Sequence, residues 1–290
     1  MEMNPQPIII YITSRGHSGS TLLDLLISSH SRVTTVGELK VLSYFHGHQR
    51  RLQILHERKC VCGAPTKFEC RFWSAVDAHL RRHAGLDLTT VDVCSEDPET
   101  FRTHNLAVFR AVMEITGTPY IVDSSKTLDR LKKLIAAEVF DVRPIHLIRS
   151  PHGVVYSNMK KGRSWLYHTR NYLIAMMRTL ELLSRYEHFT VHYETLCRHP
   201  RQTISGVMHW LGLEFEERQL DWAAHEHHNI AGNRMRYSGS SEIRLDETWK
   251  SHLNPFQKAA ISLITLPTRN SGRWLFPLWV YPMSFIRPGR

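Results

Sequence analysis

Two alternating patterns of hydrophobic and polar positions run along most of the chain. Short apolar runs rich in β-branched residues are each followed by turn or capping residues, which is typical of buried strands. These runs cover residues 8–13, 33–36, 120–122, 145–148 and 188–192. Between them, apolar residues return every three or four positions, which predicts amphipathic helices. The helices are expected at residues 21–29, 101–116, 128–139, 153–160, 167–186 and 195–211.

The order of these elements predicts the fold class. Strands and helices alternate, so the sheet should be parallel and covered by helices on both faces, an α/β fold built as a three-layer α/β/α sandwich. Ligands of such sheets bind at the carboxyl ends of the strands, where loops open into helices. The 290 residues contain no fixed-period repeat and no low-complexity segment, so we predict a single domain over residues 1–290.

The loop after the first expected strand has the composition of an anion-binding turn. Residues 14–21 (SRGHSGST) combine two glycines with four hydroxyl side chains just before a helix. Glycines let backbone N–H groups turn inward, and the helix adds the positive end of its dipole. The Walker A pattern requires a lysine where this chain has Ser20, so a phosphate or phosphosulfate fits better than the triphosphate of an ATP hydrolase. A purely structural turn with a helix cap is the alternative.

Composition and charge narrow the class of protein. Lys and Arg number 37 against 27 Asp and Glu, a formal net charge of +10, which favours an anionic ligand, a membrane surface or nucleic acid. The apolar fraction of 42% and the charged fraction of 22% are ordinary for a globular protein and exclude a fibrous or disordered chain. No signal-peptide pattern or membrane-length apolar run opens the sequence, so we expect a cytoplasmic protein.

Three segments together resemble the sulfotransferase superfamily, specifically its bacterial members related to carbohydrate and tyrosylprotein sulfotransferases. Residues 17–21 (HSGST) resemble the loop after the first strand of that family, with His17 where Arg is usual and Arg15 close by. Residues 149–157 (RSPHGVVYS) resemble its R-x-P-x-x-x-x-x-S element, and residues 232–236 (GNRMR) resemble its late G-N-x-x-R loop. The resemblance covers most of residues 8–250 and implies a P-loop-kinase-like version of the predicted sandwich.

The resemblance also implies a sulfuryl donor, 3′-phosphoadenosine-5′-phosphosulfate (PAPS), and the product adenosine 3′,5′-bisphosphate (PAP). The expected ligands of the 5′-phosphosulfate are Arg15, Gly16, His17, Ser18, Gly19, Ser20 and Thr21. Arg149 and Ser157 are expected to hold the 3′-phosphate, because an arginine at a strand end offers a rigid fork to a doubly charged phosphate. Arg236 is expected to close over the nucleotide.

Sulfuryl transfer to a hydroxyl needs a base for the hydroxyl proton and positive charge at the leaving oxygen, but in principle no metal. Glu38 follows the second strand between the apolar Val36 and Leu39, and the resemblance implies that it is the base. Lys126 ends the segment DSSK after the third strand, where relatives place a lysine for the leaving oxygen. Histidines are the alternative bases, especially His30, His46, His48, His168 and His227.

Two other functions are compatible with parts of the sequence. A nucleotide-dependent kinase would hold ATP in the first loop and magnesium on Asp123, although the loop lacks the usual lysine. A nucleic-acid-binding protein would use the positive charge, although no reader motif is present. We predict a sulfotransferase whose partners are the nucleotide sulfate donor and a hydroxyl-bearing acceptor, with no nucleic acid. A sugar, a phenol, a lipid headgroup and a peptide tyrosine all remain open as acceptors.

A cysteine cluster and an apolar segment near the end of the sequence suggest a metal site and a membrane contact. Cys60, Cys62 and Cys70 cluster with His56 nearby, a spacing that zinc can use, but reduced thiols packed under a loop explain it as well and we predict no metal. Residues 274–286 are rich in Trp, Phe, Leu and Pro. Their prolines break helical periodicity, which favours a tail packed on the core, with contact to a membrane interface as the alternative.

Overall fold

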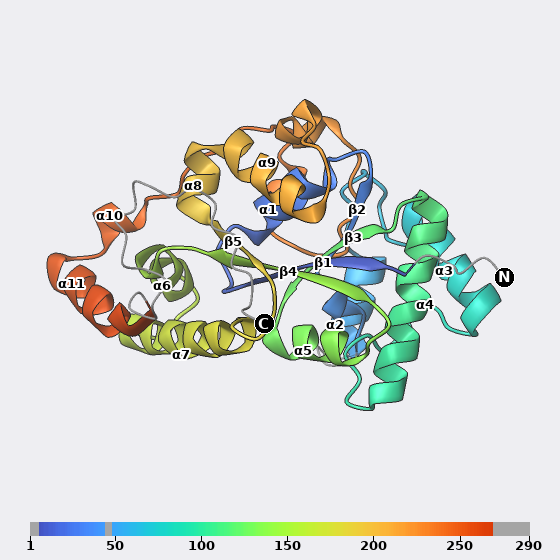
Figure 1. Ribbon diagram of the computed structural model, residues 1–290, viewed down its shortest axis with the longest axis horizontal. Helices are drawn as coiled ribbons and strands as arrows, with labels where there is room; N and C mark the ends of the chain where they lie inside the picture. Colours follow the sequence, from blue (N-terminus) through green and yellow to red (C-terminus); the bar gives the residue numbers. More distant parts are fainter. Residues whose placement is uncertain (1–5, 44–47, 269–290) are drawn as a thin grey trace.

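A five-stranded parallel sheet forms the centre of the molecule (Figure 1). The structure is a computed structural model, and it describes residues 6–43 and 48–268. The strand order is β2-β3-β1-β4-β5, and every neighbouring pair runs parallel. The strands are β1 (Ile8–Ser14), β2 (Val33–Gly37), β3 (Tyr120–Lys126), β4 (Asp141–Ile148) and β5 (Phe189–His192). The predicted parallel α/β sandwich is confirmed.

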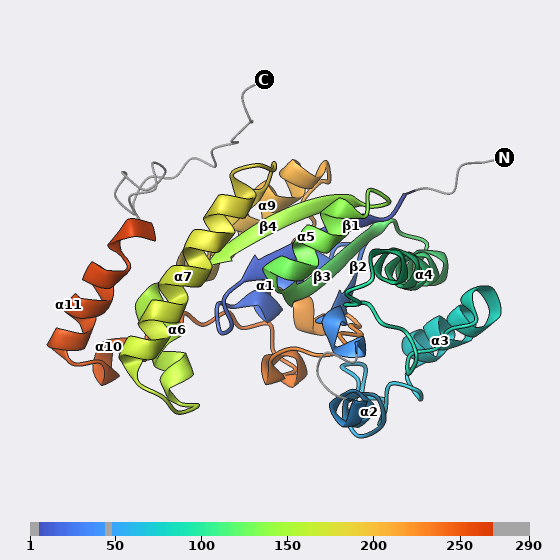
Figure 2. The ribbon, with the colours of Figure 1, turned by 90° about the horizontal axis from the view of Figure 1, so that it is seen from below.

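The central strand β1 shows how the two helical layers are held. Ile9 and Tyr11 pack on one face with residues of α4 (Pro98–Thr116) and α5 (Leu128–Ala136). Ile10 and Ile12 pack on the other face with residues of α1 (Ser20–Ser28) and α9 (Pro200–Leu211). All four side chains are fully buried, and burying a side chain of this size contributes roughly 1.5–3 kcal/mol. Figure 2 shows the sheet from below, between the layers.

The remaining helices extend the molecule at its two ends (Figure 1). One end holds α3 (Arg71–Ala84), which packs beside α4, whereas α2 (His48–His56) lies nearer the middle of this view. The opposite end holds α6 (Pro151–Met159), α7 (Trp165–Leu183), α10 (Trp249–His252) and α11 (Pro255–Ile264). The short elements are α8 (Tyr193–Arg198), η1 (Leu39–Leu42), η3 (Glu217–Leu220), η4 (Trp222–Ala224), η5 (Arg234–Tyr237) and η6 (Leu266–Thr268).

Two predicted boundaries are wrong for identifiable reasons. The helix expected at residues 195–211 is two helices, because Pro200 is the first residue of α9 and a proline ring cannot continue the preceding helix. Strand β3 continues to Lys126, through the polar residues that follow the predicted run of residues 120–122. It can do so because Ser124 donates to Asp24 Oδ2 at 2.7 Å and Ser125 Oγ accepts from the Lys40 backbone at 3.0 Å. Their hydroxyls are thus satisfied inside the fold.

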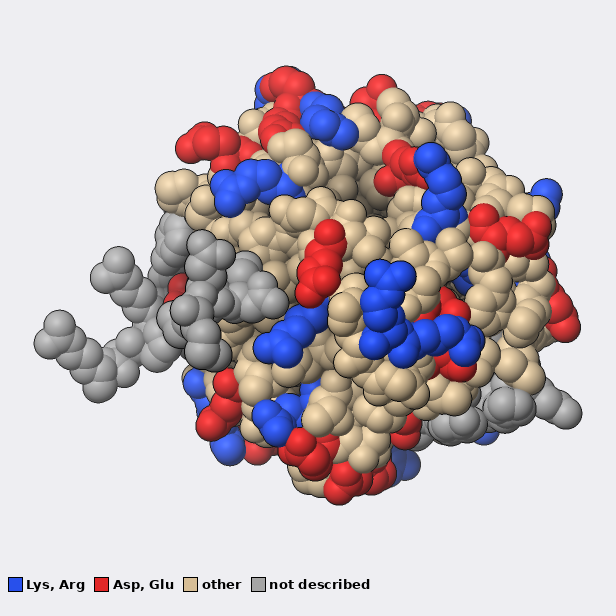
Figure 3. Space-filling view, turned by 90° about the vertical axis from the view of Figure 1, so that its right-hand side faces the viewer, with Lys and Arg blue, Asp and Glu red and all other residues tan. Residues whose placement is uncertain are grey.

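The surface charge and the helix lengths of the described residues bear on nucleic-acid binding and on membrane insertion. On the side shown in Figure 3, basic and acidic side chains of the described residues lie intermixed. That side therefore does not present the continuous basic stripe that would favour nucleic-acid binding. Within residues 6–43 and 48–268, no helix is both long enough and apolar enough to cross a membrane. The apolar segment 274–286, with its predicted packing, lies outside the described residues.

Candidate active site

The loop between β1 and α1 adopts a conformation that ordinary residues rarely take. His17 has φ 67° and Gly19, the N-cap of α1, has φ 90°. A Cβ on Gly19 would lie 2.5 Å from Tyr193 Cδ2, so only glycine fits this position. Backbone strain at a non-glycine residue costs about 1–3 kcal/mol and collects at functional sites. The loop therefore brings the chain tightly around the N-terminus of α1, where an anion would be stabilised.

Several polar groups in this loop are buried with no hydrogen-bond partner in the described part of the chain. They include Ser18 Oγ and Arg15 Nε, and Ser18 itself is only 1% exposed. Burial of polar atoms without partners costs about 1–3 kcal/mol each, so such groups indicate a missing ligand. The donors are those that an anionic oxygen would accept from, and the loop therefore fits a phosphate or phosphosulfate.

Positive charge surrounds the same loop. The pKa of His17 is lowered from its ordinary value of 6.5, first by burial and then by the charges of Lys161, Arg149, Lys126 and Lys160. Three of these cations come from the ends of β3 and α6 and from the residue after β4. Their convergence creates the electrostatic setting of an anion site.

The loop of residues 232–236 lies against the start of α1. The Asn233 backbone donates to Thr21 Oγ1 at 3.0 Å. Arg236 is 6% exposed, and its Nη2 donates to the Tyr237 hydroxyl at 2.9 Å. Its Nε and Nη1 are buried without a partner among the described residues. The structure thus brings this loop, which the sequence placed over a nucleotide, into contact with the first loop and leaves two donors of Arg236 available.

Arg149 joins the end of β4 to the first loop. Its Nη1 donates to the His17 carbonyl at 2.8 Å, and its Nη2 donates to Asp246 Oδ2 at 2.9 Å. Its guanidinium carbon lies 4.6 Å from the centre of the Tyr193 ring. Burial alone would raise the pKa of Asp246, but hydrogen bonds from Thr248 and Arg149 bring it to about 2. The fork of Arg149 is thus fixed in place beside the loop, with an anion already bound to it.

Ser157 is the second predicted ligand of the 3′-phosphate. It lies on α6 and is partly buried. Its hydroxyl makes no hydrogen bond to Arg149, whose guanidinium donates to His17 and Asp246 instead.

Glu38 and Lys126 meet at the carboxyl ends of neighbouring strands. Glu38 directly follows β2, and Lys126 is the last residue of β3, with φ 73°. Lys126 Nζ donates to Glu38 Oε1, and Lys40 Nζ lies 3.8 Å from Glu38 Oε2. The Glu38 side chain is 19% exposed. The sequence predicted an apolar setting from Val36 and Leu39, but these side chains point into the core and the carboxylate lies between two lysines.

A family model decides the class of protein. The model described as the sulfotransferase family matches residues 7–217, which is most of the chain and includes the loop after β1, Glu38, Lys126 and Arg149. The chain belongs to the sulfotransferase family. The search of curated proteins finds no match to this sulfotransferase.

Solved structures of other sulfotransferases share its fold. The sulfotransferase domain of the Synechococcus PCC 7002 olefin synthase is 20% identical, with a TM-score of 0.62 over 95% of this chain and 98% of that chain. The sulfotransferase domain from the curacin biosynthetic pathway is 20% identical, with a TM-score of 0.56 over 90% and 98%. Sulfotransferase STF9 from Mycobacterium avium is 11% identical, with a TM-score of 0.52 over 91% and 76%. At these identities the likeness establishes the fold alone.

Three of the histidines named as alternative bases lie within hydrogen-bond distance of backbone carbonyls. His30 Nε2 lies 2.9 Å from the Glu214 carbonyl, and His168 Nε2 lies 2.9 Å from the Gly162 carbonyl. His227 is buried and lies 2.9 Å from the Trp222 carbonyl. His46 lies outside the described residues, and the side chain of His48 is not described. Three of the five rival bases therefore have structural roles.

The kinase interpretation requires Asp123 to bind magnesium, and the surroundings of this residue argue against it. Asp123 is 0% exposed, and its Oδ2 accepts from Arg130 Nε at 2.8 Å. Its Oδ1 accepts from the Ser125 backbone at 2.9 Å. Both carboxylate oxygens are thus engaged inside the core of the sulfotransferase, where a hydrated magnesium ion has no access.

Sequence reasoning missed two residues of this site. Tyr193 is one of them, since its ring lies under Gly19 and Arg149 and its hydroxyl accepts from the Asp246 backbone at 3.2 Å. Asp246 was not singled out, although it pairs with Arg149. No sequence signal identifies Asp246, because it lies 97 residues from its partner in a polar loop.

Proposed function

We propose that this sulfotransferase transfers a sulfuryl group from PAPS to the hydroxyl of an acceptor. One observation carries the proposal: Glu38 and Lys126, chosen from the sequence as base and leaving-group partner, form a direct ion pair at adjoining strand ends. Lys126 also adds to the positive field at His17 in the anion-binding loop. A base, a cation and an anion cradle therefore converge, which is the set that this reaction requires.

The donor would be held by three groups of residues. The first loop, residues 15–21, would bind the 5′-phosphosulfate through its unpaired donors and the N-terminus of α1. Arg149, with Ser157, would bind the 3′-phosphate, and Arg236 would reach the nucleotide with its two unpaired nitrogens. Bound PAPS supplies the sulfuryl group and a phosphate-stabilised leaving oxygen.

In this proposal Glu38 and Lys126 divide the chemistry. Glu38 accepts the proton of the acceptor hydroxyl as the new oxygen–sulfur bond forms. Lys126 donates to the bridging oxygen as the sulfur–oxygen bond of the donor breaks, which stabilises the charge that stays on PAP. Their ion pair parts in that step, because each residue exchanges its partner for a reacting group. Lys126 reaches this place from the end of β3, where its backbone has φ 73°.

Turnover of paired variants tests these roles. With radiolabelled PAPS and a screen of sugars, phenols, lipid headgroups and tyrosine peptides, Glu38→Gln should lose roughly 10²–10⁴-fold in kcat while still binding PAP. Lys126→Ala should also lose kcat with PAP binding retained. Glu57→Gln and Lys132→Ala are matched controls on exposed positions and should keep full turnover. Near-normal kcat in Glu38→Gln would remove Glu38 as the base.

A further inference from the structure

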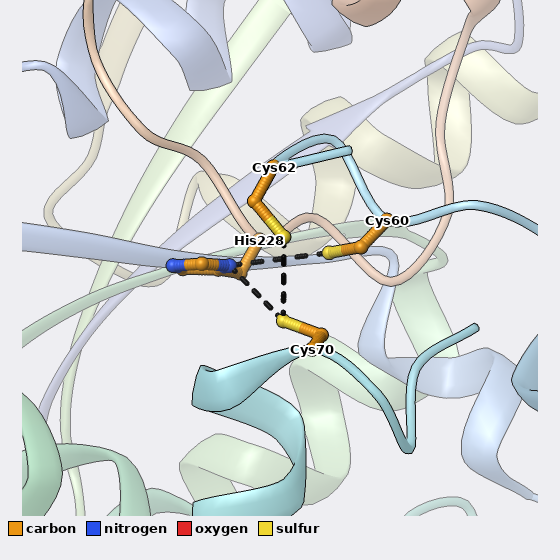
Figure 4. Close-up of side chains that lie close together, drawn as sticks. All are labelled: Cys60, Cys62, Cys70 and His228. Carbon is orange, nitrogen blue, oxygen red and sulfur yellow. Dashed lines mark hydrogen bonds between the residues drawn. The ribbon is translucent and has the colours of Figure 1, made fainter. Parts of the chain in front are cut away.

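Four side chains with metal-binding atoms meet at one point outside the candidate active site. They are Cys60, Cys62 and Cys70, from the segment between α2 and α3, and His228, from the segment before the loop of residues 232–236 (Figure 4). Their ligand atoms all lie within 4.8 Å of one another. His56, which the sequence placed beside the cysteines, instead packs its ring 4.7 Å from that of Phe68. The fourth member lies 158 residues from Cys70 along the chain.

The distances match the edges of a tetrahedron around one ion. Zinc bonds of about 2.3 Å to sulfur and about 2.0 Å to nitrogen imply ligand separations of roughly 3.5–3.8 Å. Cys62 Sγ and Cys70 Sγ are 3.6 Å apart, and Cys70 Sγ and Cys60 Sγ lie 3.3 Å and 3.9 Å from His228 Nδ1. A disulfide requires sulfurs about 2.05 Å apart, which no pair here approaches. The spacing suits a single ion and leaves no space for a multi-iron cluster.

The backbone and the histidine ring are held in this arrangement from outside. Gly63, with φ 93°, allows the tight turn in which the Cys60 backbone donates to the Ala64 carbonyl at 2.8 Å. The His228 ring stacks on Phe72 with ring centres 4.8 Å apart. Its other nitrogen, Nε2, lies 3.6 Å from Glu226 Oε1, as metal-binding histidines commonly have a carboxylate behind them. The ligand set is thus preorganised on both sides.

The local charge also suits a metal with three thiolates. Zinc with three thiolates and a neutral imidazole carries one net negative charge, which needs a nearby cation when buried. Lys67 is 0% exposed, and its Nζ donates to the Arg58 and Lys59 carbonyls at 3.2 Å and 2.8 Å. Its charge interacts with all three cysteines of the cluster.

We propose that Cys60, Cys62, Cys70 and His228 bind one zinc ion as a structural site. Four protein ligands fill its tetrahedral positions, which leaves none for a substrate. The ion joins the segment of residues 60–70 to the segment that leads into residues 232–236. Tyr237 reinforces the same junction, since its hydroxyl donates to the Lys59 carbonyl at 2.9 Å. The metal site does not depend on the proposed function.

Metal analysis of the intact protein tests the proposal. The full chain is purified in reducing buffer without a metal-affinity step. Its zinc content is then measured by inductively coupled plasma mass spectrometry. We expect one zinc per chain, loss of it in Cys70→Ser and His228→Ala, and retention in Cys94→Ser and Cys197→Ser, which lie outside the cluster. Wild-type protein without zinc after refolding with the ion, or equal loss in Cys94→Ser, would overturn the site.

Cobalt substitution keeps the test independent of whether the variants fold. Wild-type protein refolded with Co²⁺ should show the thiolate charge-transfer band and the intense visible bands of a tetrahedral cobalt site, and added zinc should abolish them. The weak spectrum of six-coordinate cobalt would contradict four protein ligands. Because these measurements involve no nucleotide, they can fail while PAP binding and turnover succeed, and the converse also holds.

Discussion

Replacing Asp24 by Asn tests whether this buried carboxyl is neutral in the folded protein. Asp24 lies on α1 and is 1% exposed. Its Oδ2 accepts from Ser124 Oγ at 2.7 Å and from Asn229 Nδ2 at 3.0 Å. No cation pairs with it among its hydrogen-bond partners in the described chain, and burial raises its pKa from 3.8 to about 7. Asparagine keeps the accepting oxygen and removes the charge.

The raised pKa of Asp24 makes the stability of the folded protein depend on pH. Between pH 4 and pH 7 the folded protein keeps a proton that the unfolded chain has lost, so stability falls as pH rises through this window and levels off above about 7. Each pH unit in the window is worth about 1.4 kcal/mol. Between pH 5 and pH 8 the free energy of unfolding should therefore fall by about 3 kcal/mol because of Asp24. Asp24→Asn should lose this dependence and be more stable than wild type at pH 8.

Urea unfolding at pH 5, 6, 7 and 8, followed by circular dichroism, measures the difference between variant and wild type. The difference is needed because burial lowers the pKa of His146 to about 3 and of His227 to about 4, and these groups make stability rise with pH. Asp129→Asn, at an exposed position on α5, is the control and should leave the slope unchanged. An Asp24→Asn difference that does not vary with pH would refute a neutral buried carboxyl.

Two further substitutions probe the anion site. Gly19→Ala should lower PAP affinity at least tenfold by titration calorimetry, because its Cβ would displace Tyr193 from beneath Arg149; Gly212→Ala, also at positive φ but in open space, should leave affinity unchanged. Equal losses in both would point to general strain. Asp246→Asn should tighten PAP binding about fivefold, since it removes about 1 kcal/mol of repulsion toward the phosphate at Arg149 while the backbone contact remains. Weaker binding would mean that the carboxylate is needed to hold Arg149.

The sheet and the loop after β1 could be predicted because their signals are local. A buried parallel strand must be apolar on both faces, and the run Ile9 to Ile12 carries that requirement in adjacent residues. The placement of Glu38 and Lys126 at one edge of the sheet could also be predicted, since parallel strands end at the same edge. Their direct ion pair could not, because it also requires that β2 and β3 be neighbours in the sheet.

The rest depends on contacts between distant segments, which local patterns do not encode. Asp246 reaches Arg149 and His228 reaches Cys70 only through the path of the chain after α9. The predicted strand of residues 120–122 stopped before Ser124 and Ser125 because their buried partners, Asp24 and the Lys40 backbone, lie elsewhere in the chain. Polar residues therefore misled the prediction where tertiary hydrogen bonds satisfy them.

Calorimetric binding of PAP compared with 5′-AMP tests the central claim most directly, because the two nucleotides differ only in the 3′-phosphate. A charge-assisted contact with Arg149 contributes about 1.5–3 kcal/mol, so PAP should bind roughly tenfold to hundredfold more tightly. Arg149→Ala should reduce PAP affinity by a larger factor than 5′-AMP affinity, because Arg149 also donates to the His17 carbonyl in the loop that would hold the 5′-phosphate of both nucleotides. Equal affinity of the wild-type protein for the two nucleotides would contradict the assignment of Arg149 and of PAPS as the donor.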